Sequence, residues 1–440
     1  MNTDMNRWLP CQSACEMSGS ACFFLSISDI AVLIHGPRWC STIAAGEMAN
    51  IEKKYEKRFF CSEIKQSDLV FGAAEEIGKA LEEVRQEMTP EMIAVMTSCS
   101  MSLIGDDLEG ICKSHNVGCP VLTMDSGGLR GEFLTGYERA CLNLLKQTDL
   151  EKDIQKDPKT VNIIGWCSAY PQSQGDLKEI RRLLEKTGIS CHLILGSDST
   201  KMETIKSMGR ASLNLVLYPE LGLKAAKMIK EKWQIPYAVL PVPYGPAGTK
   251  TWLSAICEKL GITPDMTAIN EEISYRQEKI DLATFRLKQN NRHLLFGDVY
   301  AHLTYGTACG LIPALQKEFP ELNNIYLRLE GPGDVNSISG IIPWIPYSPI
   351  HMEEDEIALS LGNTYTRQET GHFHKTIYKN FLFPHVNLQI PEKCYAGLKG
   401  WQIFLSEVYN DFYTLAYMNG RTPQSRPFDN FATETDDFGC

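Results

Sequence analysis

The hydrophobic and polar positions of this sequence follow two alternating patterns. Short apolar runs bounded by Gly, Asp or Ser predict buried strands, and stretches with apolar residues at every third or fourth position predict amphipathic helices. The first part of the chain is expected to contain helices at 66–86 and 108–114 and strands at 92–96 and 121–124. Short strands that alternate with helices are typical of parallel sheets covered on both faces.

The same alternation occurs twice more. In the second part, the pattern predicts strands at 161–165, 190–195, 213–217 and 237–240, with helices at 175–188, 201–208 and 223–233. The third part is expected to open with a strand at 293–296, followed by a turn at Gly297-Asp298 and a helix toward Phe319. We therefore predict an α/β fold with three doubly wound parallel-sheet domains of the Rossmann-like type.

Polar and charged segments mark the boundaries between these domains. The polar stretch at 148–160 is expected to link the first two domains, and a charged helix around 270–289 is expected to join the second to the third. The expected units are an N-terminal domain at 1–155, a second domain with the linker helix at 156–289, a third domain at 290–390, and a C-terminal segment at 391–440 that packs back on the first domain.

Length and charge narrow the class of protein. A chain of 440 residues is too long for one ordinary core. The formal net charge of -11 argues against a nucleic-acid surface, because phosphates need a basic face. The N-terminus MNTDMNRWLPC lacks the apolar core of a signal peptide, and the most apolar stretch, at 21–34, is interrupted by Ser26, Ser28 and Asp29. We expect a cytoplasmic protein that binds neither nucleic acid nor membranes.

The chain contains 15 cysteines, which is many for a reducing compartment where disulfides are rare. Many are interpreted as small core residues, as Cys112, Cys141, Cys191 and Cys257 are, because they lie in apolar helix-like or strand-like patterns. Two others lie on predicted loops. Cys99 follows the strand at 92–96, and Cys40 follows the apolar run at 30–34 through Gly36-Pro37. Ligands of doubly wound sheets bind at the carboxyl ends of strands, so both thiols are candidates for chemistry.

Cysteines on loops of this kind serve three kinds of chemistry. Zinc ribbons favour paired CxxC motifs, and the candidate cysteines show none. A thiol protease needs a partnered histidine, and His35 near Cys40 has no third group to orient it. Iron–sulfur clusters accept thiolates scattered on loops, with glycines that let the backbone approach the sulfides. The candidate ligands are Cys11, Cys15, Cys22, Cys40, Cys61 and Cys99. A set of three would leave a four-ligand cluster incomplete, so the last ligand would come from another residue or another chain.

Several motifs together resemble one protein family. HGPRWC, TSCSMSLIGDDLEG, DLVFGAAEEIGKALEEV and GGLRGEFLTGY are similar to segments of the nitrogenase component 1 family. The resemblance continues through GDLKEIRRLLEKTGI, QIPYAVLPVPYGPAGTKTW, LLFGD and LGNTY to CYAGLKGWQIF, and so covers nearly the whole chain. The pairing of HGPxxC with CxxxxIGDD is the specific part. The family includes MoFe-protein subunits, cofactor-assembly scaffolds and subunits of dark-operative protochlorophyllide reductase.

The resemblance implies a ligand set and two partners. Cys15, followed by Gly19, Cys40 and Cys99 match the three family cysteines that hold an iron–sulfur cluster, either 4Fe–4S or a larger P-cluster-like one, at the interface with a homologous subunit. Cys11 and Cys22 fit the first position less well. An ATP-hydrolysing iron protein is implied as the electron donor. Gly105 is expected to begin the next helix, with Asp106 and Asp107 favouring its N-terminus.

The sequence departs from the catalytic subunit of nitrogenase at the second metal site. Tyr218 stands where that subunit has its cofactor cysteine, His385 is out of register with the cofactor histidine, and Tyr137 and its neighbours replace paired histidines. The second site is therefore predicted to be absent or rebuilt, with a second metallocofactor or a tetrapyrrole left open. Dinitrogen reduction by this chain alone is not expected.

Five further positions keep two interpretations each. Cys394 and Cys309 are either replacement thiols or ordinary core cysteines. Arg130 either steers an anionic ligand or pairs with a nearby acid. His372 and His374 lie either on one face of a strand or in a polar loop.

Three functions follow from these observations. The first is an iron–sulfur oxidoreductase subunit that reduces an unidentified substrate. The second is a non-catalytic scaffold or partner subunit for assembly of a nitrogenase-type metallocluster. The third is a structural α/β binding protein with relic cysteines.

Overall fold

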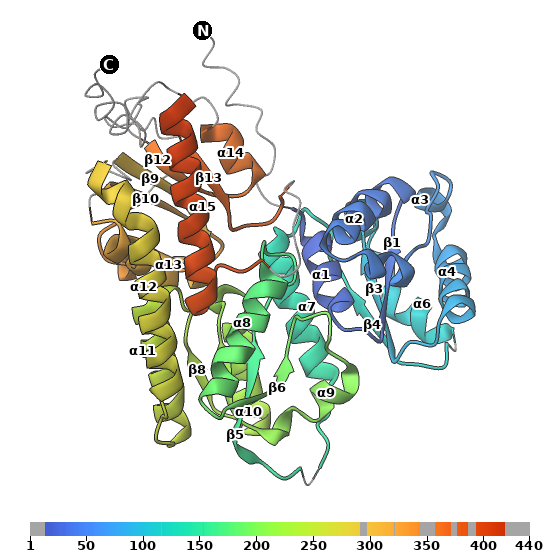
Figure 1. The fold of residues 1–440 in the computed structure, drawn as a ribbon. Coiled ribbons are helices and arrows are strands. Elements are labelled where there is room, and N and C mark those ends of the chain that lie inside the picture. The colour runs from blue at the N-terminus through green and yellow to red at the C-terminus, as the bar shows by residue number, and fades with distance from the viewer. Residues whose placement is uncertain are drawn as a thin grey trace, which may run out of the picture.

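Three parallel β-sheets, each covered by helices, make up the protein in the computed structural model (Figure 1). The structure describes residues 14–115, 117–152, 154–290, 297–320, 322–343, 357–370, 376–385 and 393–418. The three sheets take their strands from three successive parts of the chain, which confirms the predicted α/β fold with Rossmann-like sheets. No helix in the described ranges is long and apolar enough to cross a membrane.

The first sheet carries the candidate cysteines. Its order is β2-β1-β3-β4, formed by β1 (Ile30–His35), β2 (Phe59–Cys61), β3 (Met92–Thr97) and β4 (Val121–Met124), and all neighbours are parallel. Every residue of β1 and β3 is buried, because helices cover both faces of the sheet. The helices of this domain are α1 (Glu16–Leu25), α2 (Arg38–Ile51), α3 (Asp68–Phe71), α4 (Ala74–Glu87), α5 (Cys99–Ile104) and α6 (Leu108–Ser114), with a 3-10 turn at Lys53–Arg58.

The second sheet follows after α7 (Phe133–Gln147), which packs against α1. Its order is β6-β5-β7-β8, with β5 (Asp157–Ile164), β6 (Ser190–Ile194), β7 (Ala211–Val216) and β8 (Tyr237–Val239). Its helices are α8 (Ser173–Lys186), α9 (Met202–Lys206), α10 (Pro219–Trp233) and α11 (Gly245–Leu260), with a 3-10 turn at Met208–Arg210. α12 (Thr267–Asn290) lies between the elements of the second and third sheets in chain order.

The third sheet has the order β11-β10-β9-β12-β13. Its elements are β9 (Gly297–Thr304), α13 (Tyr305–Glu318), β10 (Leu322–Glu330), a 3-10 turn at Val335–Ser337, β11 (Ile342–Pro343), β12 (Ile357–Gly362), α14 (Thr364–Thr370) and β13 (Ile377–Asn380). The expected strand at 293–296 lies outside the described residues. The expected turn at Gly297-Asp298 is wrong, because both residues belong to β9, where the Asp298 carboxylate accepts hydrogen bonds from the backbone and side chain of Asn324.

Two local predictions in the first domain are corrected by glycine conformation. The helix expected at 66–86 is divided into α3 and α4 at Gly72, whose φ of 93° ends the first of them. Gly105, with φ 75°, ends α5 rather than beginning the next helix. Asp107 does cap that next helix, α6, since its carboxylate accepts a hydrogen bond of 3.0 Å from the amide of Gly110.

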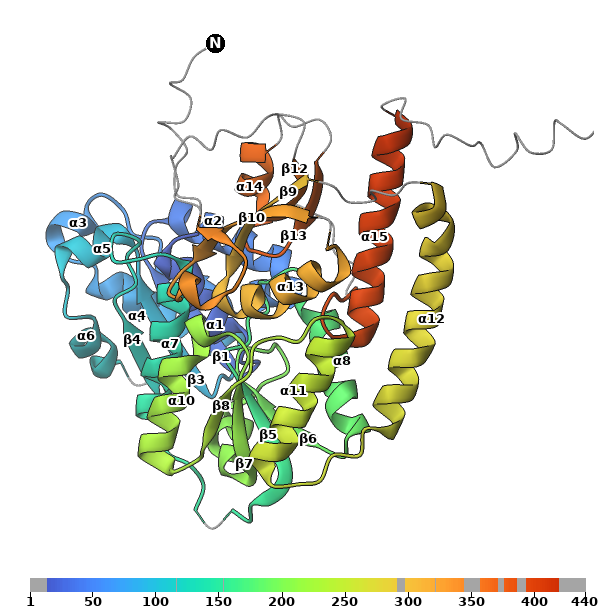
Figure 2. The same cartoon turned by 90° about the vertical axis from the view of Figure 1, so that its left-hand side faces the viewer.

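The C-terminal helix α15 (Gly397–Met418) packs mainly against α8, α11 and α12, and Figure 2 shows it running beside α12. For the described residues 393–418, the expectation that this segment packs back on the first domain is therefore corrected. The apolar side chains of Trp401, Phe404 and Val408 are buried in the main core. Just before the helix, Asp176 of α8 accepts hydrogen bonds from the amides of Tyr395 and Ala396.

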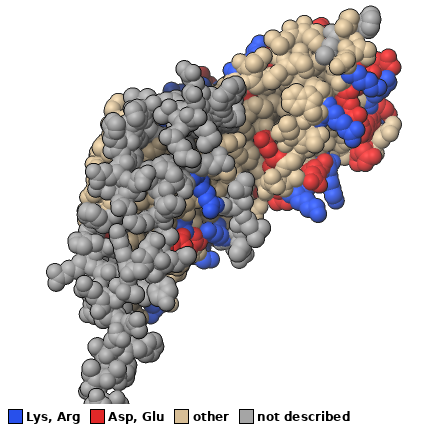
Figure 3. Space-filling view, turned by 90° about the horizontal axis from the view of Figure 1, so that it is seen from above, with Lys and Arg blue, Asp and Glu red and all other residues tan. Residues whose placement is uncertain are grey.

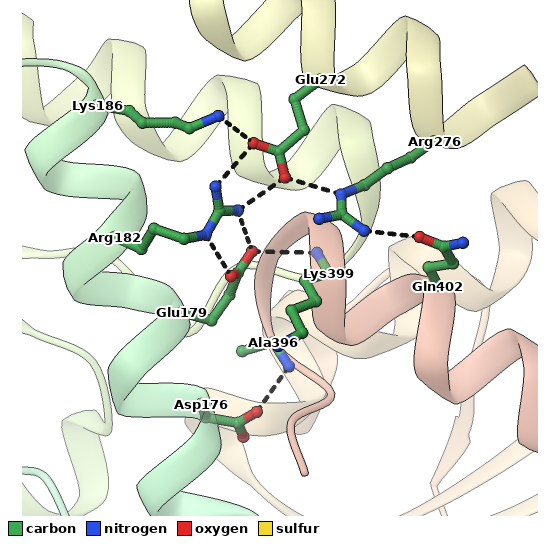
Figure 4. Close-up of polar contacts among 9 residues, drawn as sticks. All are labelled: Asp176, Glu179, Arg182, Lys186, Glu272, Arg276, Ala396, Lys399 and Gln402. Atoms are coloured by element: carbon green, nitrogen blue, oxygen red, sulfur yellow. Dashed lines mark hydrogen bonds and ion pairs between the residues drawn. The ribbon is translucent and has the colours of Figure 1, made fainter. Parts of the chain in front are cut away.

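Charged side chains strengthen this junction (Figure 4). Glu272 of α12 receives hydrogen bonds from Arg182, Lys186 and Arg276. Burial opposes the charge of Glu272, but these donors outweigh it and lower its pKa to about 2. Arg276 also reaches Gln402 of α15. The network ties the linker helix and the C-terminal helix to the second domain.

Candidate functional site

The carboxyl edge of the first sheet brings together thiols from distant parts of the chain. Cys40 lies in the first turn of α2, directly after β1, and Cys99 is the first residue of α5, directly after β3. Cys15 is the N-cap of α1 and reaches the same edge through a β-bridge with Glu132. All three are partly buried. The parallel order of the sheet explains this convergence, because the loops after β1 and β3 emerge at one edge.

Gly128, in the loop after β4, lies between two of these thiols. Its amide donates a hydrogen bond of 3.1 Å to the sulfur of Cys99. A Cβ at this position would lie 3.0 Å from the Cβ of Cys15 and 3.4 Å from the sulfur of Cys99. Glycine at this position therefore lets the backbone approach both cysteines without a tight Cβ contact. Backbone N–H groups directed at sulfur are a common feature of iron–sulfur sites.

The pKa of the Cys40 thiol shows that the clustered cysteines interact electrostatically. Burial, and after it the nearby thiols of Cys99, Cys15 and Cys61, raise the pKa of Cys40 to about 11. The cysteines thus lie close enough that their thiolates would repel one another. Bound metal cations reverse this effect, because they stabilise the deprotonated form of each ligand.

The three thiols do not form a site of the kind that holds a single metal ion. Within the part of the chain that the structure describes, no group of three or more His, Cys, Asp or Glu side chains could hold a metal ion. In an iron–sulfur cluster, each cysteine binds a different iron and inorganic sulfides fill the space between the irons. Three thiols and a glycine amide around one space are compatible with that arrangement.

The remaining cysteine candidates lie in different surroundings. Cys11 lies outside the described residues. Cys22 is completely buried in α1. Cys61 ends β2 at the carboxyl edge, next to α2. Cys394 is also completely buried, and burial raises its pKa to about 12. Cys22 and Cys394 have the character of core cysteines.

Arg130 pairs with an acid of its own loop. Its guanidinium lies 2.8 Å from the carboxylate of Asp125. Asp125 also accepts hydrogen bonds from Thr97 and Ser102, at the ends of β3 and in α5. The second of the two interpretations of Arg130, a structural ion pair, is the one this geometry supports.

The positions expected for a second metal site are occupied by packed aromatic rings. Tyr218, the N-cap of α10, is buried against Tyr170 and Trp166, with ring centroids 5.0 and 5.6 Å away. The hydroxyl of Tyr137 donates to the carbonyl of Trp166. The ring of His385 lies against Phe383, 6.3 Å between centroids. His372 and His374 lie outside the described residues.

A buried polar group beside Tyr218 was not anticipated from the sequence. Glu220 accepts a hydrogen bond of 3.1 Å from the amide of Gly306, so it joins the N-termini of α10 and α13. Burial raises its pKa to about 7. Among the described residues, its second carboxylate oxygen and the hydroxyl of Tyr170 have no hydrogen-bond partner. The only sequence signal was a Pro-Glu pair after an apolar strand, which is also an ordinary helix start.

Several large apolar side chains that are close in sequence to two of the thiols or to Gly128 are exposed. Trp39 and Leu103 expose 66% and 74% of their surface, and Leu129 exposes 70%. We call this set the apolar rim: Trp39, Ile43, Leu103, Ile104 and Leu129. Each member is close in sequence to Cys40, Cys99 or Gly128. Seen from above, charged side chains on the first domain gather at its outer end, and much of the surface nearer the other domains is uncharged (Figure 3).

Comparison with known proteins gives a family match over most of the chain. The family model described as nitrogenase component 1 type oxidoreductase matches residues 15–413. A solved structure described as nitrogenase Cp1 at pH 6.5 has a TM-score of 0.75 and 20% identity, and covers 95% of this chain and 94% of that one. At this identity the structural likeness supports the fold.

Curated relatives match at moderate identity. The nitrogenase iron-molybdenum cofactor biosynthesis protein NifE of Clostridium pasteurianum is 29% identical over 300 residues, covering 66% of this chain and 64% of that protein. NifE of Methanococcus maripaludis is 30% identical over 232 residues, covering 51% and 47%. The nitrogenase molybdenum-iron protein alpha chain of Methanosarcina barkeri is 28% identical over 273 residues, covering 59% and 49%. The matches thus span about half to two thirds of the length of these relatives.

Proposed function

Because this chain belongs to the nitrogenase component 1 type oxidoreductase family, we propose that it is an iron–sulfur redox subunit whose cluster is held by Cys15, Cys40 and Cys99. When bound, the cluster supplies one-electron transfer, with an ATP-hydrolysing iron protein as the proposed donor and an unidentified compound as the final acceptor. The observation that carries the proposal is the convergence of three thiols from separate segments on one open edge of the first sheet.

Electrostatics supports metal binding at this edge. Burial and the other thiols raise the pKa of Cys40 to about 11, so without a bound cation the thiol keeps its proton at neutral pH. Iron would displace that proton and relieve the repulsion between thiolates. The amide of Gly128 would then donate to a metal-bound sulfur at Cys99, a contact that tunes the potential of such clusters.

The apolar rim supports a partner subunit at the same place. Monomeric proteins rarely expose large apolar side chains side by side, and such patches mark interaction surfaces. We propose that a homologous component 1 subunit, either a second copy of this chain or a related one, covers Trp39, Leu103 and Leu129. That arrangement places the proposed cluster at a subunit interface, shielded from water.

The closed aromatic region around Tyr218 supports the prediction that the second metal site of nitrogenase is absent or rebuilt. Tyr218, Tyr170 and Trp166 pack directly on one another, and none of these side chains is a metal ligand of the kind that thiolate or imidazole provides. We therefore propose that this chain alone does not reduce dinitrogen.

A second candidate function is a scaffold for assembly of a nitrogenase-type metallocluster. The observation that favours it is the similarity to proteins described as NifE, a cofactor biosynthesis protein. On this proposal, the site at Cys15, Cys40 and Cys99 serves cluster assembly, and the chain reduces no substrate.

Two measurements on anaerobically purified protein test these proposals. Electron paramagnetic resonance during a reductive titration should show a low-potential iron–sulfur signal in the wild type and lose it in Cys99→Ala. Incubation with an iron protein, ATP and reductant should then consume ATP with formation of a reduced product. ATP use without any reduced product, together with transfer of iron to a cofactor-free nitrogenase, would favour the scaffold. An iron-free but folded wild type contradicts both.

A further inference from the structure

Cys61 lies at the same edge of the first sheet as the three proposed ligands. It ends β2, the strand next to β1, and is paired in register with Ile34. Residues in register on neighbouring parallel strands point to the same face of a sheet. Ile34 belongs to the core that contains Ala44 and Met48 of α2, whereas Leu33 faces the core of α4. The side chain of Cys61 is therefore on the α2 face, the face on which Cys40 lies.

The sulfur of Cys61 accepts two hydrogen bonds, and its thiol donates one of 3.5 Å to the carbonyl of Gly36. The hydroxyl of Ser41, the residue after Cys40, donates to it over 2.8 Å. The amide of Glu63 donates to it over 3.3 Å. Both donors can stay in place when the thiol proton is replaced by iron, and hydrogen bonds to ligand sulfurs are a common feature of iron–sulfur sites.

The backbone conformation of the turn after Cys61 directs the amide of Glu63 toward the sulfur. Glu63 has a φ of 51°, a left-handed conformation that is uncommon for a residue with a side chain. The turn is fastened to the end of β1, because the amide of Gly36 donates to the Ser62 hydroxyl and the amide of Ile64 donates to the Gly36 carbonyl. Strained backbone of this kind persists where the surrounding structure holds it, and it is frequent at functional sites.

The sulfur is also within electrostatic range of the other thiols. The charge of Cys61 is one of the three neighbouring thiol charges that act on Cys40, the others being those of Cys99 and Cys15. Three of the four strands of this sheet thus lead to a cysteine at one edge: Cys61 is the last residue of β2, Cys99 is two residues after β3, and Cys40 is five residues after β1.

We propose that Cys61 is a fourth protein ligand of the cluster, so that a single chain supplies four thiolates. This inference rests on the proposed function, and it specifies where the ligand missing from the three-cysteine set comes from. On binding, the S–H bond of Cys61 is replaced by a sulfur–iron bond and the proton passes to solvent, with no change in oxidation state. The hydroxyl of Ser41 and the amide of Glu63 remain as donors to the bound sulfur.

Alkylation of the full chain gives a direct test. Anaerobically purified protein is treated with iodoacetamide before and after iron removal by a chelator, and each cysteine peptide is quantified by mass spectrometry. We expect iron removal to speed alkylation of Cys61 on the order of tenfold, in parallel with Cys99, because a metal-bound thiolate is not free to react. Cys119 is the matched control, since it is also partly buried but precedes β4 at the opposite edge.

Two variants separate ligation from a structural role. Cys61→Ala should lower the iron bound per chain and change the resonance spectrum, and Cys61→Ser, which keeps an oxygen ligand, should restore part of the iron. Iron-loaded wild type in which Cys61 reacts equally fast before and after chelation, or Cys61→Ala with unchanged iron and spectrum, overturns this inference and leaves the proposed function standing. Iron-free wild type overturns both.

Discussion

The carboxyl edges of the sheets are used in two different ways in this molecule. At the first sheet, the edge is open, lined by thiols and surrounded by exposed apolar side chains. Where the second and third sheets meet, the edges are closed by Tyr218, Tyr170 and Trp166 around the buried carboxylate of Glu220. The same fold position therefore serves as a candidate metal site in one region and as packed core in the other. The difference lies in the side chains, since the strand topology is shared.

The comparison predicts that replacing a thiol at the open edge lowers metal binding but changes the stability of the fold little. Cys99→Ala should remove nearly all bound iron, because the remaining thiols cannot hold a cluster firmly, while the midpoint of thermal unfolding of the metal-free protein stays close to that of metal-free wild type. Iron is measured by mass spectrometry of the purified protein. Cys119→Ala should keep its iron. Equal iron in Cys99→Ala and wild type would remove the distinction between the two regions.

At the closed region, a substitution is expected to lower the stability of the fold and to leave metal binding unchanged. Tyr218→Ala should destabilise the protein by about 3–5 kcal/mol, as expected for loss of a large buried aromatic side chain, without changing the iron content. Urea unfolding followed by circular dichroism gives the free energy. Tyr275→Ala, at an exposed position of α12, should change it little. A Tyr218 variant that is fully stable but loses iron would show that the closed region belongs to the metal site.

The pH dependence of stability should also report on the closed region. Burial raises the pKa of Glu220 to about 7, so between its unfolded value of 4.5 and about 7 the folded protein holds a proton that the unfolded chain has lost. Stability from this group is complete below pH 4.5 and falls as pH rises through that window, by at most about 1.4 kcal/mol per pH unit. Glu220→Gln should flatten the profile between pH 5 and 7.

Asp176, whose pKa burial also raises to about 7, contributes a second slope of the same sign. It remains in the Glu220→Gln variant, so the profile should flatten without becoming level. Glu258→Gln, at an exposed position of α11, is the control. An unchanged profile in Glu220→Gln would mean that the carboxylate is already ionised in the folded protein.

A substitution of Gly128 is expected to have a smaller effect on bound iron and on stability. A Cβ there would lie 3.0 Å from the Cβ of Cys15, so Gly128→Val should separate Cys15 from Cys99 and reduce bound iron, at a folding cost of about 1–3 kcal/mol for the overpacking. Gly248→Val is the matched control, since a Cβ at that position meets nothing within 4 Å. Retention of full iron in Gly128→Val would indicate that the loop after β4 does not shape the site.

The smallest effect is expected from a substitution in the apolar rim, and it concerns subunit association. Leu103→Glu should weaken association with a second subunit by about tenfold, or ~1.4 kcal/mol, because it places a charge in the proposed interface. Sedimentation velocity of the wild type and the variant measures the change, and Leu282→Glu, equally exposed on α12, serves as the control. Identical association of both variants and wild type would argue against the rim as an interface.

Sequence reasoning reached the three-sheet fold and the positions of Cys40 and Cys99, because fully buried strands leave a continuous apolar signal and the next residues mark the carboxyl edge. It placed a turn at Gly297-Asp298, two residues that both lie within β9, because a local apolar pattern does not show where strand pairing occurs. The docking of α15 depends on Asp176, which precedes it by more than two hundred residues. Contacts at such separations leave no periodic signal.

Contacts between residues far apart in sequence also explain why the packing of the closed region could not be predicted. Glu220, Tyr170 and Gly306 come from different elements and meet only after the second and third domains have packed together. The comparison with nitrogenase indicated what is missing at Tyr218, but it could not show what fills the space. Only the tertiary structure supplies that information.

Quantification of iron and acid-labile sulfide in the anaerobically purified wild-type chain tests the central claim most directly. The account predicts both elements in similar amounts, bound stably through gel filtration and lost together when Cys15, Cys40 and Cys99 are replaced by alanine. A folded wild-type protein that carries neither iron nor sulfide, even after incubation with ferrous iron and sulfide under reducing conditions, would contradict it.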